Sequence, residues 1–310
     1  MRFWKYTYTV LVFLAAFLWL AVFQLPDANL HIIACDVGQG DAILAVYKNI
    51  QILTDGGIPN GKVIDCLSRH MPFWDREIEA VVNTHPQLDH YGGLIEVFKK
   101  YKVDYFIGNG LDASASEYQV LKKEVGGRGA SVINPVTGTI IRSGLMSYDI
   151  FWPSFAFLAS EGIPYPENKL STFVSKRDPN DFSVQAILSL GKFDSLLTGD
   201  IGENMSDQVI KEFTLSTSRR VEYIKVPHHG SKYGLTPDYI KAIVAKEGLA
   251  PIMAVISAGK NNRYGHPTQL ILDLLKTYGI KTFRTDLDGE TEVVTDGKRY
   301  WITKNYWITK

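Results

Sequence analysis

The segment THPQLDHYGG at residues 84–93 limits the folds open to this chain more than any other feature. It follows directly on an apolar, strand-like run at 78–82 and holds His85, Asp89 and His90 close together. Imidazole nitrogens and carboxylate oxygens are the ligands that zinc and related divalent ions take in proteins. The segment therefore predicts a metal site where a strand ends. The alternative is a polar surface loop whose histidines only form hydrogen bonds.

Three later segments follow the same design. Apolar runs end in LLTGD at 196–200, in IKVPHHGS at 224–231 and, after 253–257, in NRYGHP at 262–267. Five of the seven histidines of the chain lie in these segments or in the first one. Because strands of one sheet can end at a common edge, this recurrence favours a shared site over scattered, solvated histidines.

Length and composition predict one large domain. The 310 residues, 45% of them hydrophobic, suffice for a full core, and no linker-like tract divides them. The 33 basic and 33 acidic residues give a formal net charge of zero, which argues against a protein that holds nucleic acid through bulk charge. Strand-like runs open each half and then alternate with helical segments. We therefore expect an α/β fold with two mixed sheets and helices outside them.

Three local features have two interpretations each. The polar, proline-rich stretch at 154–179 is either a mobile flap over a substrate or an inert insertion. The C-terminal sequence YWITK occurs at 300–304 and again at 306–310, which indicates a β-hairpin or a duplication without function. Cys35 lies in an apolar strand and is interpreted as a small core residue, and a disulfide with Cys66 is the alternative.

The N-terminus predicts a membrane anchor. The run at 10–23 is continuously apolar, and with residues 6–9 it approaches the length of a transmembrane helix. Basic residues precede it and Asp27 follows, so the large domain would lie outside the cytoplasm. A cleaved signal peptide, which would leave a secreted protein, is less favoured because Trp19 and Phe23 crowd the expected cleavage region. A buried core helix is the third interpretation.

The motifs together resemble one family. They occur in the order DVGQGDA at 36–42, TDGG at 54–57, the segment at 84–93, LTGD at 197–200, HHGS at 228–231 and YGHP at 264–267. This series is similar to that of the metallo-β-lactamase superfamily, and specifically to the hydrolase domain of the ComEC/Rec2 competence proteins. The resemblance implies a four-layer αββα sandwich with its active site along one edge between the sheets. It also implies three parts: an anchor or signal peptide at 1–27, a hydrolase domain at 28–298 and a tail at 299–310.

The resemblance assigns metal-binding roles to several residues. The family positions fall on His85, Gln87, Asp89, His90 and Asp200. The first two would bind one ion, the next two a second ion, and the last would bridge both. A late histidine completes the second site. His266 is favoured because Gly265 and Pro267 fix a tight turn around it, and His228 or His229 is the alternative.

The sequence departs from the family pattern at two positions. Gln87 stands where the superfamily has histidine and the competence branch has aspartate, and an amide oxygen is a weaker ligand than either. The third histidine of the superfamily is replaced by the segment NDFS at 180–183, in which Asp181 could restore negative charge at the first ion. The first site is then weak, occupied by a hard ion such as Mn²⁺, or empty. The cofactor expected is one or two divalent ions, zinc or manganese.

The chemistry that these residues predict is hydrolysis by a metal-bound hydroxide. A divalent ion lowers the pKa of bound water to about 7. Asp89 or Asp200 would orient the nucleophile, and Lys225, His228 and His229 would neutralise a phosphate or protonate the leaving group. By the family pattern, Asp55 supports a ligand histidine from behind. Structural hydrogen bonds are the expected role of Asp36 and Asp41.

The leading functional hypothesis is a membrane-anchored phosphodiesterase or nuclease that acts on DNA or RNA. The chain lacks the many membrane spans of a DNA-uptake channel, so it would act alone or with a separate channel protein. A second hypothesis keeps the metal but changes the substrate to a lactone, a thioester or a β-lactam, although the Asn180 and HHGS motifs count against a β-lactamase. A third is a degenerate, non-catalytic module that binds nucleic acid or a partner protein. Gln87 supports this third hypothesis, and retention of the other ligands opposes it.

Overall fold

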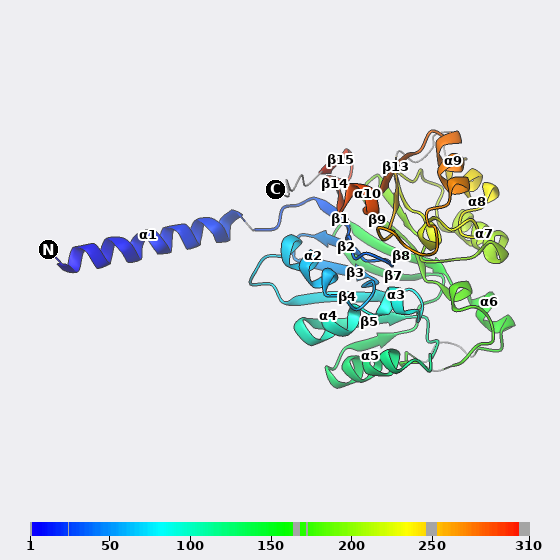
Figure 1. Ribbon diagram of the computed structural model, residues 1–310, viewed down its shortest axis with the longest axis horizontal. Helices are drawn as coiled ribbons and strands as arrows, with labels where there is room; N and C mark the ends of the chain where they lie inside the picture. The colour runs from blue at the N-terminus through cyan, green and yellow to red at the C-terminus, as the bar shows by residue number, and fades with distance from the viewer. Residues whose placement is uncertain (1, 24, 164–167, 172, 246–252, 304–310) are drawn as a thin grey trace.

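Two β-sheets packed face to face form the body of the protein (Figure 1). The computed structural model describes the chain except for residues 1, 24, 164–167, 172, 246–252 and 304–310. Over the described residues, the first sheet has eight strands in the order β15 (Tyr300–Thr303), β14 (Thr291–Thr295), β1 (Leu30–Ala34), β2 (Ile43–Tyr47), β3 (Ile50–Thr54), β4 (Glu77–Asn83), β5 (Lys102–Gly108) and β6 (Ser131–Ile133). Strands β3 to β6 run parallel, and the others are antiparallel.

The second sheet has the same mixed character. Its seven described strands follow the order β13 (Lys281–Arg284), β12 (Met253–Ile256), β11 (Tyr223–Lys225), β10 (Phe193–Leu197), β9 (Gln185–Leu190), β8 (Met146–Trp152) and β7 (Thr139–Ser143). Strands β10 to β13 are parallel and β7 to β10 are antiparallel. In each sheet, one set of parallel strands therefore ends at a common edge, which is where polar loops can meet.

Helices cover the two outer faces. Against the first sheet lie α2 (Lys62–His70), α3 (Leu88–Tyr91), α4 (Leu94–Lys100) and α5 (Ser116–Gly127). Against the second lie α7 (Ser206–Ser216), α8 (Pro237–Val244) and α9 (Gln269–Thr277). The shorter elements are α6 (Phe155–Ser160), α10 (Thr285–Asp288) and the 3₁₀ turns η1 (Pro179–Phe182), η2 (Glu203–Met205) and η3 (Pro227–Gly230).

The alternation of side chains along β1 shows how the core divides. Ile32 and Ala34 point into the apolar cluster between the sheets, whereas Ile33 and Cys35 belong to the cluster under the outer helices. Successive strand residues face opposite sides, and both sides are buried over residues 32–35, so the sequence is continuously apolar there. A third cluster lies between the second sheet and its helices. The prediction of a mixed α/β fold with two sheets is confirmed.

The predicted membrane anchor is contradicted. Helix α1 (Arg2–Phe23) forms and projects from the body (Figure 1), with exposed side chains such as Phe13 and Trp19, so it is not a core helix. In the part of the chain that the structure describes, no helix is both long and apolar enough to cross a bilayer. The run at 10–23 would extend only about 21 Å at about 1.5 Å per residue, against a hydrocarbon core of about 30 Å. The predicted single-pass membrane location, with the hydrolase domain placed outside the cytoplasm by that anchor, is therefore contradicted.

Other expectations are refined by the structure. Cys35 is buried as predicted but forms a disulfide with Cys66, which ties the end of β1 to α2. The stretch at 154–179, expected to be irregular, contains α6 and η1. The first copy of the C-terminal repeat supplies β15, which pairs with β14, and the second copy lies outside the described residues. Strand β7 was not predicted because three of its five residues, Thr139, Arg142 and Ser143, are polar and none of the five is fully buried.

Candidate metal centre

Polar side chains from both sheets meet where the parallel strands end. Strand β3 leads into Asp55, and its parallel neighbour β4 leads into the loop at 84–93. Strand β10 leads into the turn that carries Asp200, and its parallel neighbour β11 leads into η3, which carries His229. The two edges face each other, so each sheet supplies part of one cluster.

Four buried side chains form this cluster. They are Asp41, His90, Asp200 and His229, and each offers a donor atom within 4.8 Å of the others. Asp200 Oδ2 lies 3.1 Å from His90 Nε2 and 3.1 Å from His229 Nε2. Asp89 stands at the rim, with its Oδ2 atom 3.4 Å from His229 Nε2. Imidazoles and carboxylates that converge in this way match the ligand set of a zinc or manganese site.

Unpaired imidazole nitrogens support the fit to a cation. The Nε2 atoms of His85, His90 and His229 are buried and form no hydrogen bond with the described residues. The ring of His85 packs beside that of His90, with centroids 4.1 Å apart. Buried polar atoms in proteins are nearly always paired, so three such atoms in one cluster need an explanation. A divalent ion that takes their lone pairs supplies one.

Hydrogen bonds at the opposite nitrogen fix the orientation of the rings. His90 Nδ1 lies 2.8 Å from Asp55 Oδ2, and His229 Nδ1 lies 3.0 Å from the carbonyl oxygen of Ser257. Both partners are acceptors, so the proton of each neutral ring stays on Nδ1 and the lone pair on Nε2 is free to bind metal. The contact between Asp55 and His90 is the one that the family pattern predicted.

Buried carboxylates make the cluster attractive to positive charge. Burial alone lowers the pKa of His90, but the charges of Asp200 and Asp55 raise it well above its usual range. Burial alone also lowers the pKa of His229, but the charges of Asp200 and Asp41 raise it well above its usual range. Burial and the neighbouring His90 lower the pKa of His85 to about 4, so His85 stays neutral. A metal ion would replace a proton on His90 and on His229, whereas the neutral His85 has no proton to displace from one of its nitrogens.

Lys225 places a fixed positive charge inside the cluster. Its buried ammonium group contacts Asp41 and lies 3.4 Å from Asp200 Oδ1. Burial lowers the pKa of Lys225, but these two carboxylates outweigh that effect, so its pKa is raised and the group remains charged. The two oxygens of Asp200 are thus divided, one facing the histidines and the other facing the lysine. Lys225 positions the two carboxylates.

Three non-glycine residues around the cluster adopt the left-handed backbone conformation, which residues with a side chain rarely adopt. Asp55 has φ of 60°, and His228 and His229 both have φ of 52°. Left-handed geometry costs a non-glycine residue roughly 1–3 kcal/mol and is found most often at functional sites. Two such residues in succession turn the chain sharply after β11. This turn, rather than the tight turn around His266, brings an imidazole to Asp200.

Asp41 is the cluster residue that sequence reasoning gave no metal-related role. Its position depends on Gly40, where a Cβ atom would lie 1.8 Å from the carbonyl oxygen of Asp89. That close approach lets the amide of Asp41 donate to the same carbonyl oxygen at 3.2 Å, which packs the glycine-rich loop onto the loop at 84–93. The signal available in the sequence was an aspartate directly after Gly-Gln-Gly, where the backbone can approach another segment closely.

The structure places the other predicted ligands outside the four-residue cluster. The side chain of Gln87 makes no hydrogen bond or ion pair with any described residue. The carboxylate of Asp181 accepts hydrogen bonds from Asn204 at 2.9 Å and Arg177 at 3.2 Å. The rings of His228 and His266 lie with their centroids 5.9 Å apart, further along the same edge, and the Nδ1 atom of each is buried and unpaired within the described chain.

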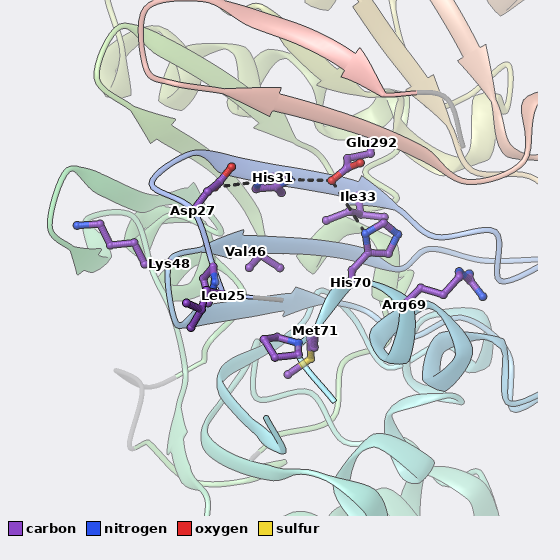
Figure 2. A pocket seen from close by; sticks show the side chains of 12 residues that line it. Leu25, Asp27, His31, Ile33, Val46, Lys48, Arg69, His70, Met71 and Glu292 are labelled. Atoms are coloured by element: carbon purple, nitrogen blue, oxygen red, sulfur yellow. Dashed lines mark hydrogen bonds and ion pairs between the residues drawn. The ribbon is translucent and has the colours of Figure 1, made fainter. Parts of the chain in front are cut away.

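A cavity of about 420 Å³ lies elsewhere, between the segment after α1 and the first sheet (Figure 2). Figure 2 shows His31 between Asp27 and Glu292, with Nδ1 2.7 Å from the glutamate and Nε2 3.1 Å from the aspartate. His70 Nε2 lies 2.6 Å from Glu290. These contacts satisfy the ring nitrogens, so this group ties the N-terminal segment to the sheet through ion pairs.

Comparison with known proteins shows that the chain is similar to part of several competence proteins. No protein-family model matches it. It is 26% identical over 272 residues to ComE operon protein 3 of Bacillus subtilis, covering 82% of this chain and 31% of that protein. It is 26% identical over 275 residues to Recombination protein 2 of Haemophilus influenzae, covering 87% of this chain and 29% of that protein. The chain thus spans about a third of the length of these relatives.

One solved structure shows the likeness in fold. CmlA, a diiron β-hydroxylase from Streptomyces venezuelae, is similar over 87% of this chain and 54% of its own, with a TM-score of 0.50 and 13% sequence identity. At that identity the similarity concerns the fold alone.

Proposed function

The chain is a metallo-β-lactamase-like domain of the ComEC type, and we propose that it is a metal-dependent phosphodiesterase that acts on nucleic acid. The observation that carries the proposal is the convergence of His90 Nε2 and His229 Nε2 on one oxygen of Asp200, with no hydrogen bond to occupy either nitrogen. Both nitrogens face the same carboxylate oxygen at 3.1 Å, so a divalent ion could replace the protons between them.

His90, Asp200 and His229 are the residues that would hold the ion, with Asp89 at the rim. A divalent ion there would supply a water molecule of lowered pKa at neutral pH and polarise a phosphoryl oxygen. Asp89 is partly exposed and can accept a proton from an attacking water. The rings of His228 and His266 lie beside the cluster, and an imidazole N–H group that reaches the substrate could donate to its oxygens.

The contacts of Lys225 favour a single ion over a pair. The carboxylates of Asp41, Asp55, Asp89 and Asp200 and the ammonium of Lys225 give a net charge of −3 when the imidazoles are neutral. One divalent ion reduces this to −1. Lys225 faces the oxygen of Asp200 that would otherwise bridge to a second ion, and neither Gln87 nor Asp181 lies in the cluster. We therefore propose one zinc or manganese ion.

The names of the relatives support nucleic acid as the substrate class. One is called a recombination protein and another, Competence protein ComA of Neisseria gonorrhoeae, matches 37% of this chain at 28% identity. Recombination and competence are processes that involve DNA, and the chain covers 29% and 16% of the two proteins so named. The substrate class is thus proposed from the relatives, and the hydrolytic chemistry from the centre.

The test is hydrolysis of bis(p-nitrophenyl) phosphate by the full chain, stripped of metal and reloaded with Mn²⁺ or Zn²⁺. Asp200→Asn removes a charge from the cluster, and Asp181→Asn makes the same change at a buried carboxylate outside it. We expect metal-dependent turnover that falls at least about 100-fold in the first variant and little in the second, because loss of a catalytic electrostatic group costs that much.

Two comparisons make this assay decisive. Turnover of p-nitrophenyl acetate or a lactone in the absence of phosphodiester cleavage would favour the carboxylic-ester alternative. A folded protein that binds metal and turns over none of these substrates would refute the hydrolase proposal and favour a binding role.

A further inference from the structure

We infer that a cavity beside the metal centre is a binding site for a single strand of nucleic acid, held by phosphate contacts and one stacked base. The inference deepens the proposed function, because it names how the same centre would hold its substrate. The cavity measures about 590 Å³ and reaches the centre at Asp89. Its lining includes Asp36, Gln39, Lys62, Lys260, Arg263 and Tyr264.

Each sheet supplies one wall of this cavity. The glycine-rich loop at 36–40 and the start of α2 come from the first sheet, and the loop at 259–264, after β12, comes from the second. The two loops touch at Gly259, where a Cβ atom would lie 3.1 Å from the amide nitrogen of Gln39. The cavity is therefore part of the same edge that holds the cluster.

The charges of the lining suit a polyanion. The chain as a whole has a net charge of zero, yet three cationic side chains gather here. Lys62 lies 3.5 Å from Asp36 in an exposed pair of the kind that is worth little. Lys260 and Arg263 are exposed and form no ion pair with the described residues. Cations left free at the mouth of a phosphodiesterase centre can neutralise phosphates of a bound strand.

An aromatic ring and an amide complete the lining. Tyr264 is 62% exposed, and its ring stacks on His266 at a centroid distance of 5.9 Å, which leaves the other face of the ring open. Aromatic rings of this kind stack unpaired bases, whereas bases in a duplex are not available for stacking. The Oε1 atom of Gln39 is buried and has no hydrogen-bond partner in the described chain. The side-chain amide of Gln39 lines the cavity, where it can form hydrogen bonds with a base edge or a sugar hydroxyl that reaches it.

The loop that carries these groups is held in place before any ligand arrives. Asn262 donates from Nδ2 to the carbonyl oxygens of Gly259 at 3.0 Å and His266 at 2.6 Å, and its Oδ1 accepts from the amide of His266 at 3.0 Å. This single side chain closes the loop on itself. Preorganisation of this kind reduces the entropy lost on binding.

The experiment measures binding rather than turnover. Fluorescence anisotropy of a labelled single-stranded DNA of about 12 nucleotides would follow binding to the full chain, in EDTA and again with Mn²⁺, from about 50 to 200 mM salt. The variants are Lys260→Ala with Arg263→Ala, and Tyr264→Ala. The matched controls are Lys99→Ala with Arg142→Ala, and Tyr105→Ala, all exposed and remote from the cavity.

We expect the paired cation variant to lower the slope of log affinity against log salt by about 0.7 for each phosphate that the variant no longer neutralises. Tyr264→Ala should weaken single-strand binding about 5- to 150-fold, the range expected for one stacked base, and leave duplex binding unchanged. The control variants should behave as the wild type. Absence of single-strand binding by the wild type in both conditions, or equal effects of cavity and control variants, would overturn the inference.

The two proposals fail separately. Phosphodiester turnover without cavity-dependent strand binding would leave the hydrolase standing and remove the binding site. Cavity-dependent strand binding without turnover would keep the binding site and remove the hydrolase.

Discussion

Asp55 controls which nitrogen of His90 carries the proton. Its Oδ2 atom lies 2.8 Å from His90 Nδ1 and accepts from the Thr84 hydroxyl at 2.7 Å. Its Oδ1 atom accepts from the Thr84 amide at 2.8 Å and from Asn83 at 3.3 Å. All four partners can act as donors at once, which only a carboxylate can satisfy. When His90 loses the proton that faces Asp200, its remaining proton therefore stays on Nδ1 and Nε2 becomes free to bind an ion.

Replacing this carboxylate by an amide should weaken metal binding with little change in shape. In Asp55→Asn, the remaining oxygen should stay with the Thr84 amide, because that donor cannot rotate, and the NH₂ group then faces His90. The ring must accept at Nδ1 and move its proton to Nε2, where the proton blocks metal. The backbone cost is small because asparagine tolerates the φ of 60° found here. Loss of such a supporting contact weakens metal affinity about 10- to 100-fold, or about 1.4–2.7 kcal/mol.

Calorimetric titration of Mn²⁺ into metal-stripped protein would measure the change. Asp194→Asn is the matched control, since Asp194 is also fully buried and accepts hydrogen bonds from Ser189 and Arg219, away from the centre. We expect this control to bind metal like the wild type. An Asp55→Asn protein with native circular dichroism and wild-type affinity would refute the reasoning about the proton on His90.

Three further predictions concern pH and the disulfide. Metal affinity should rise as pH increases through neutrality, because the raised pKa values of His90 and His229 leave protons on these rings that the metal must displace. Competition with a chelator would measure the affinity, and a flat profile from about pH 6 to 8 would contradict the prediction. Burial lowers the pKa of His31 but its carboxylate partners raise it further, so its contribution to stability is complete below about pH 6.5 and lost as pH rises through the folded pKa. The melting temperature of His31→Gln should therefore fall below wild type more at about pH 6 than at about pH 9. Replacing Cys35 and Cys66 by alanine should lower the free energy of unfolding by about 4 kcal/mol in urea titrations, since the bridge closes a loop with a sequence separation of 31.

The polar residues at the ends of strands were predictable, because a strand and the polar loop after it are adjacent in the sequence. The loop at 84–93 and the turn at Asp200 each combine an apolar strand with its polar end in one short window of sequence. The strands of the core were predictable for the same reason, since burial on both faces leaves a continuous apolar run, as in β2 (Ile43–Tyr47). Such features need no knowledge of distant segments.

The membership of the cluster depended on contacts between distant segments. Asp41 joins it only because Gly40 packs against the backbone of Asp89, some fifty residues later in the chain. His229 reaches Asp200 because two successive residues, His228 and His229, adopt the left-handed conformation. Their residue types do not predict that conformation. The pairing of Asp181 with Arg177 and Asn204 likewise depends on where η2 packs. The sequence pattern predicted the candidate residues, and the tertiary contacts determine which of them lie in the cluster.

The division of the candidate ligands between the two sheets has a thermodynamic consequence. His90 comes from the first sheet, and Asp200 and His229 come from the second, so an ion held by all three would bind only while the sheets stay packed at that edge. Unfolding would then have to release the ion. A free metal concentration 100 times the dissociation constant would stabilise the folded chain by about 2.7 kcal/mol. A melting temperature of this protein would therefore report its metal supply together with the packing of its core.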